Sequence, residues 1–447
     1  MQETFYANAI ERDLAAGASA AQHTFTVQAI IDKGLAGMGL SPFEAAVLLK
    51  NKDPQVTQSI LDAARQVKQR IYGKRVVIFA PLYINDHCVN NCRYCGYKAD
   101  NQTLRRVLTQ DEIAAEVRVL ESMGHKRLAL EAGQHPDHAP IEYITESIET
   151  IYNTVNDNGV IRRVNVNIAA ASEDDYRKLK AANIGTYVLF QETYHPEAYA
   201  YYHPDGPKSD FTWHSTAMDR AMSAGIDDIG LGALFGLYDA DFEVLGLLHH
   251  ALHLEKTHGV GPHTISVPRM KAAAGSAEPL YPLDDEHFVK IVAVLRLALP
   301  YVGLIASTRE SEILRKRLLH AGVSQISAGS RTGVGSYTLD EEALSQFSVS
   351  DTRNLDEVVR WLCEDGFIPS FCVDCYREGR TGDLFMNLAK SGKINEYCTP
   401  SALKTLVEYS AGYATGDTKA AIAALLERLQ SEPEEDVAYK GHCCNSH

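Results

Sequence analysis

The chain has 447 residues, of which 45% are apolar and 23% charged. These values are typical of globular proteins and exclude collagen-like, fibrous and disordered chains. Asp and Glu number 58 against 43 Lys and Arg, so the net charge is −15. Such an acidic chain repels phosphate backbones and anionic lipid, so nucleic acid and membrane surfaces are not expected partners.

The first thirty residues show no basic segment followed by an apolar core, because Glu3, Glu11, Arg12 and Asp13 lie among the apolar positions. A secretory signal is therefore not expected. No window reaches the roughly eighteen uninterrupted apolar residues of a transmembrane helix, so we expect a cytoplasmic protein. Nine cysteines in such a protein indicate metal or redox chemistry rather than disulfides, and six of them lie in two tight groups.

The N-terminal region, residues 1 to about 74, is predicted to be helical. Ser41-Pro42-Phe43-Glu44 combines a capping box with proline at the first helical position, which predicts a helix start. Short β-rich apolar runs follow, each bounded by Gly, Pro or polar residues. They predict eight strands, at residues 75–82, 127–132, 163–168, 186–191, 229–235, 264–267, 302–307 and 324–328.

Helical patterns lie between these strands, with start signals such as Thr109–Glu112 and Ser172–Asp175. Eight strands alternating with helices over about 260 residues indicate a closed parallel (β/α)8 TIM barrel, with an open doubly wound sheet as the alternative. After about residue 338 the strand pattern stops, and the remaining patterns are helical. We therefore expect a helical N-terminal extension at 1–74, the barrel at 75–338, and a helical C-terminal domain at 339–447 that carries the second cysteine group.

The first cysteine group directly follows the first predicted strand, where Cys88, Cys92 and Cys95 form C-x3-C-x2-C. Three thiolates on one loop can hold three irons of a four-iron cluster, which leaves the fourth iron open to a small-molecule ligand. A loop at the C-terminal end of a barrel strand is also where such folds place their active sites. The alternative is a structural zinc ion with His87 as fourth ligand, although zinc sites usually come as two separated pairs.

This segment resembles the radical S-adenosylmethionine (SAM) superfamily, whose motif has this spacing with an aromatic residue just before the third cysteine, here Tyr94. The resemblance implies that SAM binds the open iron and that an electron from the 4Fe-4S cluster cleaves it to a 5′-deoxyadenosyl radical. It also implies a glycine-rich run after the second strand that receives the SAM amino group, here with Gly133 and Gln134. Gln134 replaces the usual acid, but its amide oxygen can still accept a hydrogen bond. An ordinary strand-to-helix turn is the alternative.

The second cysteine group lies near the C-terminus, where Cys372, Cys375 and Cys398 form C-x2-C-x22-C. Spacing alone allows a structural zinc ion with Cys363 or a histidine as fourth ligand. A second iron-sulfur cluster with an open iron fits better in a protein that already carries one.

Both cysteine groups and the segments between them resemble the tyrosine lyases of FeFe-hydrogenase maturation over essentially the whole chain. Further segments that carry the resemblance are 78–83, 162–169, 187–195, 261–269 and 307–310. The family implies that L-tyrosine is cleaved to p-cresol and dehydroglycine. Dehydroglycine then becomes carbon monoxide and cyanide on an auxiliary 4Fe-4S cluster with a labile fifth iron, for assembly of the hydrogenase H-cluster.

The same resemblance implies that His263, at the start of the sixth strand, and a free cysteine hold the labile iron. From the residues alone, His263 would be a hydrogen-bonded structural histidine. A reductant protein and the other hydrogenase maturation proteins are the expected protein partners.

Polar residues at strand ends are further candidates for the radical site. Glu192 and Arg309 are expected at the C-terminal ends of the fourth and seventh strands. Arg309 could clamp a substrate carboxylate, and Glu192 could take a proton from an amine or phenol. An ion pair in the barrel rim is the alternative for each. Asn165 and Asn167 point the same way from the third strand and are predicted to contact SAM.

Two other functions remain open at this point. The 2-iminoacetate synthase of thiamine synthesis shares the fold and the tyrosine substrate but releases dehydroglycine, and it lacks the C-terminal cysteine motif that is present here. The non-enzymatic alternative is an iron-sulfur scaffold without SAM chemistry. Tyr94 and the predicted eight-strand barrel disfavour it.

Overall fold

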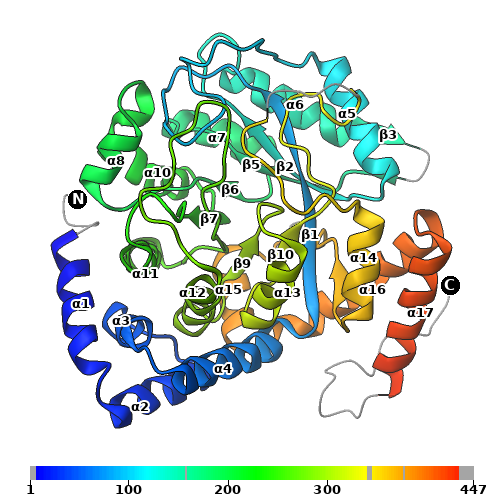
Figure 1. The fold of residues 1–447 in the computed structure, drawn as a ribbon. Helices are drawn as coiled ribbons and strands as arrows, with labels where there is room; N and C mark the ends of the chain where they lie inside the picture. Colours follow the sequence, from blue (N-terminus) through cyan, green and yellow to red (C-terminus); the bar gives the residue numbers. More distant parts are fainter. Residues whose placement is uncertain (1–6, 157–158, 340–344, 376–377, 432–447) are drawn as a thin grey trace.

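A closed ring of parallel strands forms the centre of the computed structural model, which describes residues 7–156, 159–339, 345–375 and 378–431. Eight strands follow one another in the order β10-β9-β8-β7-β6-β5-β2-β1, and pairing of β10 with β1 closes the ring (Figure 1). The predicted TIM barrel is confirmed and the open sheet is excluded. The strands of the ring are β1 (Arg75–Asn85), β2 (Arg127–Ala132), β5 (Arg163–Asn167), β6 (Tyr187–Val188), β7 (Ile229–Gly232), β8 (Thr264–Ser266), β9 (Gly303–Ala306) and β10 (Gln325–Ser327).

Helices connect the strands around the outside of the ring, because parallel neighbours need long crossovers. The first of them begins at its predicted capping box, in which Thr109 Oγ1 accepts from the Glu112 backbone N–H and Glu112 Oε2 accepts from that of Thr109. The connecting helices are α5 (Gln110–Ser122), α6 (Ile141–Asn153), α7 (Glu173–Ala181), α8 (Pro196–Tyr202), the 3-10 helix η1 (Pro207–Ser209), α9 (Phe211–Ser215), α10 (Ala217–Ser223), α11 (Ala240–His258), α12 (Asp285–Ala298) and α13 (Glu312–Ala321).

Four helices precede the barrel, as predicted for the N-terminal region. The capping box of Ser41 and Glu44 is present, and Pro42 is the first residue of its helix. The last of these helices packs against α12 and α13, so the N-terminal region covers one side of the barrel. They are α1 (Ala7–Ala20), α2 (Thr24–Leu35), α3 (Pro42–Lys50) and α4 (Pro54–Tyr72).

The C-terminal region consists of α14 (Leu355–Glu364), β11 (Ile368–Ser370), α15 (Gly382–Lys390), α16 (Ile394–Gly412) and α17 (Gly416–Ser431). The expectation that strands stop after residue 338 is wrong, because β11 joins the sheet of the barrel. This strand spans three residues and contains Pro369, so it shows no alternating pattern in the sequence.

The position of β11 links the C-terminal region to the bottom of the barrel, meaning the N-terminal ends of its strands. Arg75 pairs with Ile368 and Val77 with Ser370, whereas β2 pairs with β1 only from Ala80 onward. β11 therefore occupies the edge of β1 below β2. In Figure 1, α14 and α16 lie on this side of β1.

Side chains that point into the ring come in layers, because every second residue of a strand faces the same side. On β2 and β5 the paired residues are Arg127 with Arg163, then Ala129 with Asn165, then Glu131 with Asn167. The interior is therefore cationic near the bottom and carries a carboxyl and an amide near the top, the C-terminal ends of the strands.

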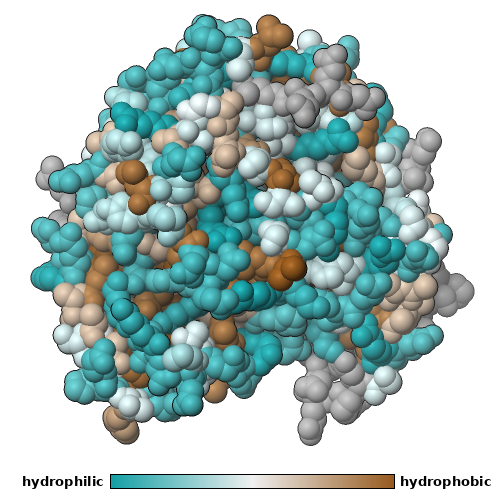
Figure 2. Space-filling view, in the orientation of Figure 1, coloured by the Kyte–Doolittle hydropathy of each residue, from teal (hydrophilic) through white to brown (hydrophobic). Residues whose placement is uncertain are grey.

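Outside the ring, β3 (Val155–Asn156) and β4 (Gly159–Val160) form a small antiparallel pair. Hydrophilic residues cover most of the face drawn in Figure 2, and apolar residues are scattered among them. Within the described ranges, no helix is long and apolar enough to cross a membrane.

Candidate functional site

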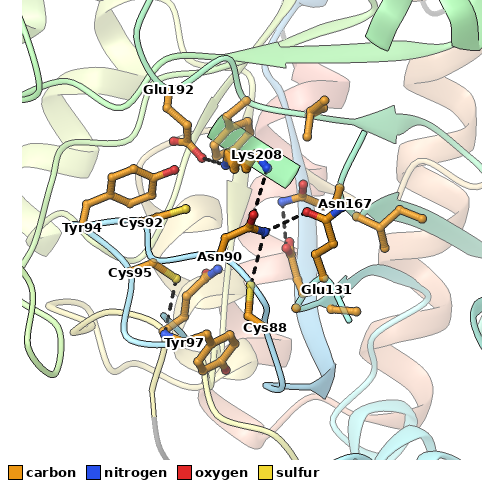
Figure 3. A pocket seen from close by; sticks show the side chains of 18 of the residues that line it. Cys88, Asn90, Cys92, Tyr94, Cys95, Tyr97, Glu131, Asn167, Glu192 and Lys208 are labelled. Atoms are coloured by element: carbon orange, nitrogen blue, oxygen red, sulfur yellow. Dashed lines mark hydrogen bonds and ion pairs between the residues drawn. The ribbon is translucent and has the colours of Figure 1, made fainter. Parts of the chain in front are cut away.

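The first cysteine group lines a cavity at the top of the barrel, on the loop that follows β1 (Figure 3). Burial raises the pKa of Cys92 to about 12 and that of Cys95 to about 11. As free thiols these groups keep their protons at neutral pH. A bound metal would convert them to thiolates, because metal ligation displaces the thiol proton.

The three thiols fit an iron-sulfur cluster better than a single metal ion. In the part of the chain that the structure describes, no three His, Cys, Asp or Glu side chains converge as ligands of one metal ion would. An iron-sulfur cluster does not require such convergence, because each thiolate binds a different iron. The proposed zinc ligand His87 instead stacks on His138, with ring centroids 3.9 Å apart. The zinc alternative is therefore disfavoured.

The loop after β2 packs tightly against the cysteine loop. Val89 donates its backbone N–H to Gln134 O at 2.8 Å, and a Cβ on Gly133 would lie 2.4 Å from the His87 carbonyl oxygen. Only glycine permits this approach of the two backbones. The side-chain oxygen of Gln134 accepts a hydrogen bond from Asn90 Nδ2 at 2.8 Å. Gly133 and Gln134 both line the cavity, as the prediction requires.

Tyr94 also lines the cavity and is anchored by a histidine. Its hydroxyl lies 2.8 Å from His203 Nε2. His203 Nδ1 lies 2.8 Å from the carbonyl oxygen of Tyr199, so Nδ1 donates and Nε2 accepts from Tyr94. This bond fixes the aromatic residue of the cysteine motif in one orientation.

Glu192 follows β6 and reaches the cavity with a backbone φ of 69°, a left-handed conformation that is rare outside glycine. Its Oε1 lies 2.8 Å from Lys208 Nζ. Burial alone would lower the pKa of Lys208, but the charge of Glu192, its hydrogen bond and the nearby Cys92 and Cys95 together raise it. The two groups therefore form an ion pair inside the cavity.

Arg309 lies on the loop after β9, and its guanidinium carbon is 3.4 Å from the ring centroid of Phe347. Burial lowers its pKa, although a guanidinium with an ordinary pKa above 12 stays charged at neutral pH. It forms no salt bridge with any described residue and lines the cavity. A cation in this situation is available to an incoming carboxylate.

A carboxyl group faces the same space from the top layer of the barrel interior. Asn167 Nδ2 donates to Glu131 Oε2 at 2.7 Å. Burial raises the pKa of Glu131 to about 8, while the hydrogen bond from Asn167 and the charge of Arg309 act in the opposite direction.

The cavity continues into the ring. A second hollow shares Tyr83, Glu131, Asn167, Arg309 and Phe347 with the first. It extends to Ser266 and Ser327, the last residues of β8 and β10, and to Ile305 near the end of β9. The space beside the cysteine loop therefore enters the upper part of the ring.

The second cysteine group comes together below β2. Cys375 Sγ and Cys398 Sγ are 3.8 Å apart, and the hydrogen bond from Cys375 lowers the pKa of Cys398. Cys372 follows β11 with a backbone φ of 46°. Backbone strain of this kind clusters at functional sites. Burial lowers the pKa of Arg127 to about 10, and the neighbouring Cys372 acts in the opposite direction.

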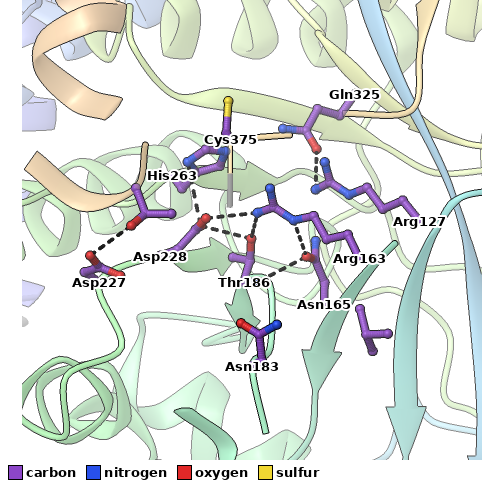
Figure 4. Close-up of polar contacts among 12 residues, drawn as sticks. Arg127, Arg163, Asn165, Asn183, Thr186, Asp227, Asp228, His263, Gln325 and Cys375 are labelled. Atoms are coloured by element: carbon purple, nitrogen blue, oxygen red, sulfur yellow. Dashed lines mark hydrogen bonds and ion pairs between the residues drawn. The ribbon is translucent and has the colours of Figure 1, made fainter. Parts of the chain in front are cut away.

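Buried cations surround this end of the barrel (Figure 4). Arg163 Nη2 lies 2.9 Å from Asp228 Oδ2, whereas Arg127 Nη2 donates to the neutral Gln325 Oε1 at 3.3 Å. Arg127 Nε and Nη1 are buried without a hydrogen-bond partner among the described residues. Two guanidiniums against one carboxylate leave a positive excess, which favours anionic sulfur ligands.

His263 lies at the start of β8, at the same end of the barrel. Its Nδ1 is 3.6 Å from Asp228 Oδ1, and the Phe385 ring of α15 packs on it with centroids 4.0 Å apart. Burial lowers the pKa of His263 to about 4, so the imidazole is neutral at physiological pH. The neutral form is the one that binds metals, so His263 suits a ligand role as well as a structural one.

A model of the radical SAM superfamily matches residues 82–249, and a model of the Biotin and Thiamin Synthesis associated domain matches residues 266–368. The 2-iminoacetate synthase of Salmonella typhimurium is 30% identical over 340 residues, which cover 76% of this chain and 89% of that protein. The chain belongs to the radical SAM superfamily.

Two solved structures of FeFe-hydrogenase maturases resemble the chain along nearly its whole length. A structure of HydG, a maturase of the FeFe-hydrogenase, is 49% identical with a TM-score of 0.92, covering 97% of this chain and 96% of that one. The HydG of Carboxydothermus hydrogenoformans is 41% identical with a TM-score of 0.84 and the same coverage. A 4Fe-4S cluster and SAM follow from the radical SAM family.

The cavity at the top of the barrel brings most of the residues predicted for the radical SAM site together, but not Asn165. This residue was expected beside SAM, yet it does not line the cavity. Its Oδ1 accepts from Arg163 Nε at 3.1 Å and from the Thr186 backbone N–H at 3.0 Å. Asn165 and Asn167 face the same side of the strand. Asn165 lies two residues earlier, which places it roughly 6.6 Å further down the barrel.

Other residues that line this cavity were not predicted from the sequence. Glu131 is an inward residue near the end of a correctly predicted strand, so alternation along that strand could have found it. Lys208 lies in an irregular segment, and Gln346 and Phe347 reach the cavity from beyond the expected end of the barrel at residue 338. No sequence pattern places those three residues at the cavity.

Proposed function

We propose that this radical SAM protein is a tyrosine lyase that cleaves L-tyrosine to p-cresol and dehydroglycine. It then converts dehydroglycine to carbon monoxide and cyanide for assembly of the FeFe-hydrogenase H-cluster. The observation that carries the proposal is the presence of two separate cysteine groups at opposite ends of one barrel. Similarity to HydG along the chain supports the same function.

At the top of the barrel, Cys88, Cys92 and Cys95 would hold the 4Fe-4S cluster, with Tyr94, Gly133, Gln134 and Asn167 around the space for SAM. When bound, the cluster and SAM supply a 5′-deoxyadenosyl radical that takes a hydrogen atom from the tyrosine amino group.

Residues of the chain itself orient the substrate and keep water out. Arg309 offers two parallel N–H donors to the tyrosine carboxylate, a geometry that fixes position as well as charge. Phe347 stacks on this guanidinium and limits its motion. Glu192, held by Lys208, presents a fixed carboxylate to polar groups of SAM or tyrosine. Enclosure of this space protects a reactive intermediate from water.

The hollow in the upper part of the ring would receive dehydroglycine, which would then move through the barrel to its bottom. There Cys372, Cys375 and Cys398 would hold the auxiliary 4Fe-4S cluster. His263 and a free cysteine would hold the labile fifth iron. The buried Arg127 and Arg163 would balance the negative charge of thiolates and sulfides.

The decisive experiment is an assay of the anaerobically reconstituted protein with SAM, a chemical reductant and L-tyrosine. We expect p-cresol together with carbon monoxide and cyanide. Absence of p-cresol would refute the lyase proposal, since that product requires only the cluster at the top.

The 2-iminoacetate synthase function is the second candidate, because a protein of that name is 30% identical to this chain. The same assay separates the two functions. A 2-iminoacetate synthase would form p-cresol without carbon monoxide or cyanide. The proximity of Cys375 and Cys398 favours the first function.

A further inference from the structure

Two carboxyl groups face the cavity, and they differ in their partners. Glu192 is already neutralised by Lys208 at 2.8 Å. Among the described residues, no cation bonds to Glu131, which is held by the neutral amide of Asn167. An ammonium group gains more from a carboxylate without a cation than from one that is already ion-paired. Glu131 is therefore the better receptor for a cationic group that enters the cavity.

The surroundings of Glu131 fit an amino acid. Asn167 engages Oε2, and Oε1 makes no hydrogen bond with any described residue (Figure 3). Arg309 lines both hollows together with Glu131 and is close enough to lower its pKa. An unpaired guanidinium and a carboxyl group on one cavity wall match the carboxylate and amino group of a free amino acid.

We propose that Glu131 receives the α-amino group of the substrate tyrosine and takes its proton. This assignment rests on the proposed function and names the residue that prepares the substrate for it. An N–H bond of the ammonium breaks heterolytically, the proton moves to Glu131 Oε1, and the electron pair stays on nitrogen. No oxidant or reductant takes part in this step.

The proton transfer suits the chemistry that follows. Loss of a hydrogen atom from the substrate leaves a radical. A free amine nitrogen has a lone pair that can stabilise this radical, whereas an ammonium nitrogen has none. Burial raises the pKa of Glu131 to about 8, which narrows the gap to the pKa of the tyrosine amino group and lowers the free-energy cost of moving the proton. Arg309 is the charged side chain that acts on this carboxyl, and Glu131 in turn adds to the effect of burial that raises the pKa of Tyr83.

The test compares equilibrium binding of tyrosine and of 3-(4-hydroxyphenyl)propionate, which lacks the amino group, to the reconstituted holoenzyme by calorimetry. We expect the wild type to prefer tyrosine by about ten- to a hundredfold, the worth of one charge-assisted hydrogen bond. In Glu131→Gln the preference should fall to about threefold or less. Glu146→Gln makes the same chemical change at an exposed position on α6 and should keep the wild-type preference.

Kinetics provide a second measurement. Glu131→Gln should lower kcat for p-cresol by about a hundredfold or more, the usual contribution of a positioned base, and should change KM less. If the variant keeps the wild-type preference for tyrosine, or loses affinity for both ligands equally, the assignment is wrong. Wild-type protein that forms no p-cresol would instead refute the lyase proposal itself.

A folding control keeps the test decisive. Iron content and circular dichroism establish whether Glu131→Gln assembles normally. Should it not, Asn167→Ala removes the hydrogen bond from Asn167 Nδ2 to the Glu131 side chain and leaves the carboxyl in place. In this variant, the ratio of the affinities for tyrosine and for the analogue should fall by about three- to tenfold. Full retention of the preference in Asn167→Ala would overturn the assignment.

Discussion

The two ends of the barrel use buried charge in different ways. At the top, Glu131 and Arg309 face a hollow without bonded partners of opposite charge among the described residues. At the bottom, Arg163 and Asp228 are paired inside the ring, and Arg127 adds a further cation. The carboxyl and guanidinium groups at the top can therefore pair with the charged groups of a small zwitterion. The bottom instead offers a fixed positive environment.

The difference arises from successive layers on the same two strands. Arg127 and Arg163 lie opposite each other, and Glu131 and Asn167 lie opposite each other four residues later. Because strand residues alternate between faces, all four side chains point into the ring. One pair of strands thus supplies both electrostatic environments, and substitutions can change one end without touching the other.

The largest effect is expected from Cys92→Ala, at the top. Loss of one of three thiolates should prevent the SAM cluster from forming, so both SAM cleavage and p-cresol should disappear. Product analysis by chromatography measures both. A variant that cleaves SAM at the wild-type rate would show that Cys92 is not a ligand.

Cys375→Ala tests the other end and should have a more selective effect. We expect p-cresol formation to stay within about threefold of wild type, while carbon monoxide disappears, because tyrosine cleavage needs only the top cluster. Equal loss of both products in a correctly folded variant would contradict the separation of the two ends.

Arg163→Met tests how much the buried ion pair at the bottom of the barrel contributes to the free energy of unfolding. It leaves the Asp228 carboxylate buried without its cation, which should cost about 3–5 kcal/mol in the free energy of unfolding. The matched control is Arg177→Met, whose ion pairs on α7 are exposed and should contribute less than about 1 kcal/mol. Urea denaturation of both variants measures the difference, and equal costs would contradict it.

The smallest effect is expected from His263→Ala. If His263 holds the labile iron, the variant should contain about one iron fewer per chain and form less organometallic product, while p-cresol formation continues. Iron counting and p-cresol analysis on the same sample give the comparison. A variant with full iron content would assign His263 a structural role only.

The sequence predicts the barrel well because its strands are buried on both faces and stand out as apolar runs. All eight predicted runs contain the observed strands or overlap them, and the capping boxes at Ser41 and Thr109 begin helices as expected. Local signals of this kind depend on neighbouring residues only, so a single sequence carries them.

Features that depend on distant parts of the chain were harder to predict. β11 is short and contains proline, and its pairing with β1 joins residues nearly 300 positions apart. Alternation along the strand shows that Asn165 points into the ring. It does not show whether Asn165 lies high enough to reach the cavity. Lys208 reaches Glu192 from an irregular segment whose path is set by tertiary contacts.

The pairing of β11 with the lower edge of β1 also constrains the order of events during synthesis. That edge of β1 has no partner until residues 368–370 have been made, because β2 covers only the part from Ala80 onward. An uncovered strand edge is prone to pair with other chains. The loop of Cys88, Cys92 and Cys95 emerges early, whereas Cys372 is brought below β2 only after this late pairing. We therefore expect the auxiliary thiols to become competent for metal only in chains that have completed the barrel.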